Sequence, residues 1–104
     1  MKIIKISETE SFYNQPGITG KNFYESPKLD VVHLELEPGR SLEPHPMPMT
    51  VLFYVLEGTG VLTVDGKKYK LSQDRGLECP KGLLRFWSNE SKEKLRVLVL
   101  KINE

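Results

Sequence analysis

The segment EPHPMPM, residues 43–49, holds the side chains best suited to chemistry. Glu43, His45, Met47 and Met49 alternate with prolines, which keep the backbone extended and could present the four side chains to one side. An imidazole with thioethers is a ligand set that suits Cu(I), and Cys79 could add to it. Methionine also fills irregular apolar gaps, and a buried cysteine is inert. A soft-metal site and plain core packing are therefore both open interpretations of this segment.

Length and charge exclude several classes of protein. The chain has 104 residues, a net charge of +1 and one cysteine, so we expect one domain over residues 1–104 and no internal disulfide. No basic field favours nucleic acid or a membrane surface. No N-terminal signal peptide and no apolar run of about 20 residues is evident, so we expect a cytoplasmic protein.

The hydrophobic pattern that must position these side chains has a period of two. Val32, Leu34 and Leu36 fall on one face, and His33, Glu35 and Glu37 on the other, polar face, of a half-buried strand that ends at a Pro-Gly turn. The run TVLFYVLEG predicts a strand that is apolar on both faces, and Asp65-Gly66 predicts a hairpin turn. Further strands are expected in GLECPKGLLRFWSN and KLRVLVLKI, and one or two before residue 30 around an NQPG turn. Short strands at this spacing predict an all-β sandwich or small barrel.

The turn residues carry a family resemblance. Six positions across fifty residues resemble the two motifs of the cupin superfamily: Gly39, His45, Gly58, Pro80, Gly82 and Asn89. Asp74 stands where the second motif begins with glycine. The resemblance implies a small single-domain cupin, a double-stranded β-helix (jelly-roll) barrel, with the barrel over about residues 31–102 and N-terminal strands or an arm over residues 1–30.

The positions that hold a divalent metal in that family are mostly substituted here. They correspond to His45, Met47, Val51 and Arg85. Valine has no ligand atom, and Arg85 would place a permanent positive charge where the metal belongs. We therefore expect no metal and no other cofactor. The alternative is a metal-dependent enzyme, a dioxygenase or isomerase, that binds a divalent metal or copper through residues outside the motifs.

If the cupin register holds, the resemblance implies a pocket of mostly apolar side chains. Its ligand-binding residues would be His45, Met47, Val51, Phe53, Arg85 and Trp87. A guanidinium in such a pocket binds a planar carboxylate through two parallel hydrogen bonds. The predicted ligand is thus a small organic anion. Arg85 could instead turn outward and pair with Glu78, and a filled barrel would indicate a structural or interaction module.

Catalysis and self-association are the remaining questions. Ser41 and Cys79 have no base at the spacing of a nucleophile motif, and no carboxylate is clearly placed to assist His45, so whether the protein is an enzyme stays open. On the strand that begins at residue 50, Leu52, Tyr54 and Leu56 would face outward. An exposed row of this kind predicts a homodimer, or a face covered by residues 1–30.

Overall fold

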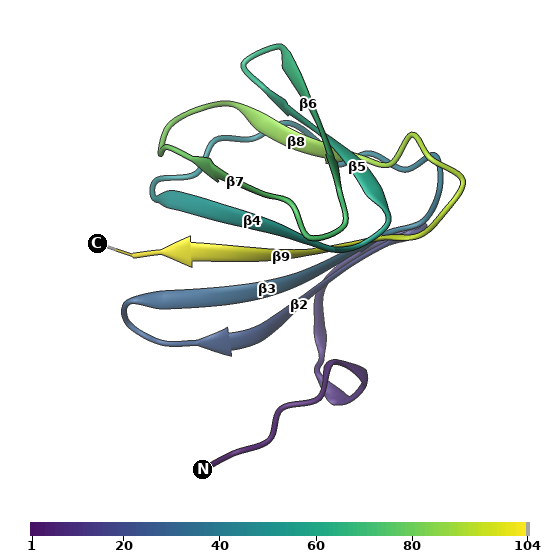
Figure 1. Ribbon diagram of the computed structural model, residues 1–104. Helices are drawn as coiled ribbons and strands as arrows, with labels where there is room; N and C mark the ends of the chain where they lie inside the picture. The colour runs from purple at the N-terminus through teal and green to yellow at the C-terminus, as the bar shows by residue number, and fades with distance from the viewer. Residues whose placement is uncertain (104) are drawn as a thin grey trace.

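The computed structural model describes residues 1–103 and consists of two sheets that face each other (Figure 1). The larger sheet has the strand order β1-β2-β3-β9-β4-β7 and the smaller one β6-β5-β8. A 3₁₀ turn, η1 (Ile6–Glu8), precedes the strands. The strands are β1 (Ser11–Gln15), β2 (Ile18–Glu25), β3 (Leu29–Leu36), β4 (Thr50–Glu57), β5 (Thr59–Val64), β6 (Lys67–Ser72), β7 (Gly76–Cys79), β8 (Arg85–Ser88) and β9 (Leu95–Ile102).

The period-two pattern decides which side chains form the core. In β3, β4 and β9 alternate residues point between the sheets, and those of β4 are Val51, Phe53 and Val55, each at most 2% exposed. They pack with the inward residues of β9, with Trp87 of β8 and with Leu62 of β5. The predicted all-β class is confirmed. No helix among residues 1–103 is long and apolar enough to cross a membrane.

The predicted turns form where the residues allow unusual backbone angles. Asp65 and Gly66 have φ of 47° and 84° and join β5 to β6, as the Asp-Gly pair indicates. Asp74, which replaces the motif glycine, has φ of 65°. Aspartate tolerates this left-handed conformation better than most residues do, so the turn keeps its shape without glycine.

Asn89 holds the loop between β8 and β9 against β3. Its side-chain nitrogen donates to the carbonyl oxygens of Leu36, at 3.0 Å, and Glu93, at 2.7 Å. Its oxygen accepts from the backbone N–H and the hydroxyl of Ser91. Asn89 is 1% exposed, so these bonds satisfy a buried amide. The motif asparagine therefore fixes the end of β8, the strand that carries Arg85.

The first thirty residues complete the larger sheet. β1 and β2 form a hairpin around the predicted Pro16-Gly17 turn, and β2 pairs with β3 along most of its length. A β-bulge in β1 falls between Ser11 and Tyr13. These strands extend the sheet beside β3, and they do not lie over Leu52 and Tyr54 of β4, which remain 38% exposed.

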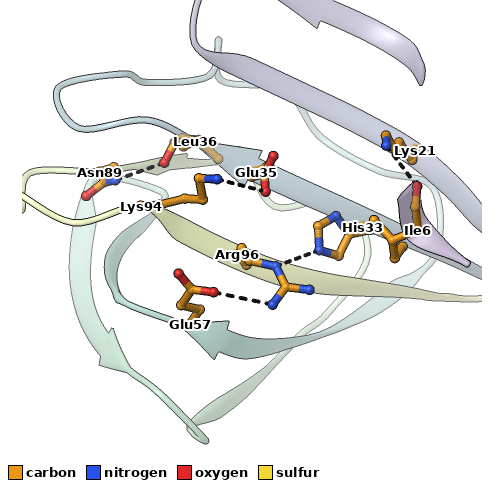
Figure 2. A network of polar contacts seen from close by, with 9 residues as sticks. All are labelled: Ile6, Lys21, His33, Glu35, Leu36, Glu57, Asn89, Lys94 and Arg96. Carbon is orange, nitrogen blue, oxygen red and sulfur yellow. Dashed lines mark hydrogen bonds and ion pairs between the residues drawn. The ribbon is translucent and has the colours of Figure 1, made fainter. Parts of the chain in front are cut away.

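The outer face of the larger sheet carries a polar network (Figure 2). His33 of β3 was expected on a polar, exposed face, yet it is 3% exposed. The Nε of Arg96 donates to its Nε2 at 3.1 Å, and Arg96 also pairs with Glu57 at 3.4 Å. Lys21, which faces His33 in register, donates to the carbonyl of Ile6 and so holds the N-terminal turn beside this ring.

Candidate functional site

A cavity of about 350 Å³ lies between the two sheets. Its walls come from β1, β2, β3, β4 and β9 on one side and from β5, β8 and the segment before β4 on the other. Most of the lining is apolar, and its polar side chains are Tyr13, His45, Arg85 and Lys101. An apolar cavity of this size with a few convergent polar groups is the usual form of a small-molecule site.

Arg85 is the buried charge of this cavity. It opens β8, where the strand alternation turns it and Trp87 inward, and it is 5% exposed. Its guanidinium carbon lies 5.2 Å from the centre of the Phe53 ring. Burial lowers the pKa of Arg85, because a charge without solvent is less stable. The guanidinium is therefore held against an aromatic face and partly stripped of water.

His45 lies beside Arg85 through a backbone bridge. The two residues exchange backbone hydrogen bonds, of 3.1 and 3.3 Å, so residues around His45 form a short extra strand next to β8. The ring Nδ1 lies 3.1 Å from the carbonyl oxygen of Glu43, which can only accept, so Nδ1 carries the proton. The Nε2 then accepts from Arg85 Nη1 at 3.5 Å. His45 thus turns the Nε2 edge of its ring toward the guanidinium.

The cavity is positively charged and has no acidic lining. Arg85 and Lys101 both line it, and no Asp or Glu among residues 1–103 does. Within residues 1–103, none of the three ion pairs involves either cation. Among the described residues, the acceptors that Arg85 Nη1 reaches are the backbone oxygen of His45, at 3.4 Å, and its Nε2, at 3.5 Å, and neither carries a negative charge. Because a buried charge is costly unless it is paired, this arrangement favours an anion in the cavity.

Aromatic side chains form much of the wall. Phe53 and Trp87 meet edge to face, with ring centres 5.5 Å apart and planes at 82°. The Nε1 of Trp87 is buried and has no hydrogen-bond partner in the described part of the chain. Gly60 gives the indole its room, since a Cβ there would lie 2.8 Å from Trp87 Cζ3 and 2.6 Å from Leu95 Cδ2.

The structure brings together five of the six residues proposed from the sequence. The residues that line the cavity are His45, Met47, Phe53, Arg85 and Trp87. Val51 points inward but is 1% exposed and packs in the core, outside the lining. Arg85 forms no ion pair with Glu78, which is exposed and pairs in register with the outward-facing Leu52.

The donor set at the cavity does not fit a metal. Of the four positions that correspond to metal ligands in the resemblance, Val51 is core and Arg85 is a cation, which leaves His45 and Met47. Within residues 1–103, no three His, Cys, Asp or Glu side chains gather as a ligand set. Cys79 is 2% exposed and outside the lining, and burial raises the pKa of its thiol, which disfavours the metal-binding thiolate.

Most of the other lining residues were not proposed from the sequence, and among them Phe12, Tyr13 and Lys101 carry a ring or a charge. Lys101 follows Leu95, Val97 and Val99 in strict alternation, so the period of β9 could have placed it inward. Phe12 and Tyr13 both line the cavity, above Gly20, because the bulge in β1 adds a residue to that strand. With strict alternation one of these two side chains would point away from the cavity, and nothing in the sequence pattern predicts the bulge.

Residues 32–101 match a family model described as "Cupin domain". The chain belongs to the cupin family. The motif resemblance read from the turn residues is thereby confirmed, and the match covers nearly the barrel range expected from it. No curated protein sequence is significantly similar to this cupin.

Solved structures confirm the jelly-roll fold of this cupin. KdgF from Halomonas sp. superposes with a TM-score of 0.83 at 19% identity, over 100% of this chain and 96% of that one. The polyketide cyclase RemF from Streptomyces resistomycificus gives 0.85 at 20% identity, over 100% and 80%. A predicted oxalate decarboxylase from Thermotoga maritima gives 0.85 at 20%, over 99% and 100%. At such identities the likeness extends to the fold alone.

Proposed function

We propose that this cupin binds a small organic anion, a carboxylate, in the cavity between its sheets and without a metal. The observation that carries the proposal is Arg85, a guanidinium 5% exposed in an apolar cavity with no carboxylate partner among the described residues. Arginine recognises a carboxylate through two parallel hydrogen bonds, and a bound carboxylate would supply the missing counter-charge.

Two competing functions make different demands. A ligandless structural module would be served by a filled barrel, whereas about 350 Å³ is open here. A metal-dependent enzyme, a dioxygenase or isomerase, would need ligands from outside the motif positions. Metal analysis of the purified protein separates these classes, since stoichiometric iron, manganese, nickel, zinc or copper would favour the enzyme.

The test of anion binding is calorimetric titration with a panel of carboxylates: acetate, hexanoate, benzoate and phenylacetate. We expect at least one to bind, and Arg85→Met to weaken that binding about 30-fold or more, because the variant loses a buried charge pair. Arg96→Met is the matched control, since Arg96 lies on the outer face of the sheet. Equal binding to wild type and Arg85→Met, or no binding across the panel, would contradict the proposal.

We also propose that a second copy of the chain covers the outer face of β4 and β9. Leu52 and Tyr54 are each 38% exposed there, and Leu52 pairs in register with Leu100 of β9. An apolar row of this kind matches itself across a two-fold axis. Light scattering at micromolar concentration should give twice the monomer mass, and Leu52→Lys should reduce it. A monomeric wild type would contradict the proposed dimer.

The cytoplasmic location of the protein stays a prediction.

A further inference from the structure

We propose that the cavity selects an aromatic carboxylate that carries a second hydrogen-bond acceptor, with Lys101 and Trp87 as further binding residues. The inference rests on the proposed function, because it assumes that Arg85 receives the carboxylate. It adds the chemical nature of the rest of the ligand, which Arg85 alone does not determine.

The aromatic character follows from the walls. Of the nine aromatic residues in the chain, five line this cavity. Phe53 and Trp87 already meet edge to face, a geometry that a ligand ring can extend on its open side. Phe12 and Phe86 belong to the lining too, and Phe12 is 55% exposed, so it stands where the cavity meets solvent. A flat ring buries more of this surface than a short acid would.

The negative end follows from the two cations. Lys101 comes from β9 and Arg85 from β8, on opposite sheets, yet both line one cavity. Among the described residues no acidic side chain lines the cavity, so the two positive charges repel each other until an anion lies between them. Lys101 therefore adds to the affinity for any carboxylate and has no effect on a neutral ring.

The second acceptor follows from Trp87. Its indole N–H is a donor only, is buried, and lacks a partner within residues 1–103. Such a group costs free energy until an acceptor reaches it. The edge of the indole that meets Gly60 is the benzene edge, so Nε1 lies on the opposite side of the ring. Arg85 and Trp87 are two residues apart on one face of β8, about 6.6 Å along the strand, a span that one aromatic ring can bridge.

Matched ligand pairs test each part. The probes are 3- and 4-acetylbenzoate, which carry an acceptor, and 3- and 4-isopropylbenzoate, which have the same shape without one; benzyl alcohol is the neutral ring. In wild type we expect one acetyl compound to bind about 3- to 10-fold tighter than its isopropyl partner. Trp87→Phe should abolish that preference. Lys101→Met should weaken both members about 10-fold or more, and the matched control Lys94→Met, which removes a lysine that pairs with Glu35, should weaken neither.

A spectroscopic readout keeps the test decisive if Trp87→Phe does not fold. Trp87 is the single tryptophan of the chain, so a proton–nitrogen correlation spectrum holds one indole signal. We expect this signal to move downfield with the acetyl compound and not with the isopropyl one. This inference fails, and the proposed function stands, if three results occur together. The acetyl and isopropyl compounds shift the indole signal equally and bind with equal affinity; Lys101→Met leaves binding unchanged; and Arg85→Met still abolishes binding. If no carboxylate binds, both fail.

Discussion

One arginine–histidine pair lies at the cavity and another on the outer face of the larger sheet, and the two pairs differ in how the charge of the arginine is balanced. Inside, Arg85 is 5% exposed beside an exposed His45, and no carboxylate accompanies it in the described chain. Outside, the histidine is the buried member: His33 is 3% exposed, and Arg96 reaches both it and Glu57. The outer pair completes itself within the fold. The inner pair has no carboxylate beside it among the described residues, and this difference is why we propose Arg85 as a binding residue and Arg96 as a structural one.

The largest effect should come from breaking the outer pair. Arg96→Met removes the donor to the buried His33 ring and the partner of Glu57. Because His33 is left with an unsatisfied buried nitrogen, we expect the free energy of unfolding to fall by about 1 to 3 kcal/mol. Urea unfolding at pH 7.5 measures it. An unchanged midpoint would mean that the outer pair contributes nothing to the fold.

The equivalent substitution at the cavity, Arg85→Met, should change the free energy of unfolding in the opposite direction. Arg85→Met replaces an unpaired buried cation with an apolar side chain of similar length. Since the cost of stripping water from the charge is removed, we expect the free energy of unfolding to rise by about 1 to 2 kcal/mol. The same urea series measures it. A clear loss of stability would show that the fold already balances Arg85.

The buried histidine should make stability depend on pH. Burial is the main reason that the pKa of His33 is lowered; the charge of Arg96 adds to it, Glu35 opposes it and Lys21 adds a little more. The unfolded state, with a pKa of about 6.5, binds the proton first, so stability falls as the pH drops below that value and levels off below the folded pKa. Between pH 7.5 and 5.5 this costs up to about 1.4 kcal/mol. His33→Gln should lose this part of the slope, and a slope equal to that of wild type would contradict the assignment.

The smallest effect concerns Glu57, the outer carboxylate. It is 51% exposed and 3.4 Å from Arg96, so solvent and salt screen the pair. We expect Glu57→Gln to cost less than about 0.5 kcal/mol, and the difference to vanish in 1 M NaCl. A loss as large as that of Arg96→Met would mean that Glu57, rather than His33, is the important partner of the outer arginine.

The fold could be predicted because its signals are local. Neighbouring residues alone determine the alternation in β3, β4 and β9 and the Asp65-Gly66 turn. The motif glycines also mark local turns, since Gly39, Gly58 and Gly82 have positive φ. His33 shows where this stops. Its place in the alternation was right, but its burial depends on Arg96, sixty-three residues away, and on the N-terminal turn.

The site was predictable only in part, for a similar reason. The register gave the inward direction of Arg85 and Trp87, whereas Val51 also points inward and still misses the cavity. An inward side chain lines a cavity only where the facing side chains leave space, and Val51 sits in register with the buried Cys79. Phe12 and Tyr13 depend on a bulge that the sequence does not mark.

Gly60 gives the cavity its depth through the side chain that it lacks. With no Cβ at this position, the Trp87 ring can lie back against β5, and a methyl group there would meet the ring at 2.8 Å. Gly60→Ala would therefore push the indole toward the cavity and make the cavity shorter. If the cavity binds carboxylates as we propose, Gly60 therefore limits the length of the ligand although it lies outside the lining.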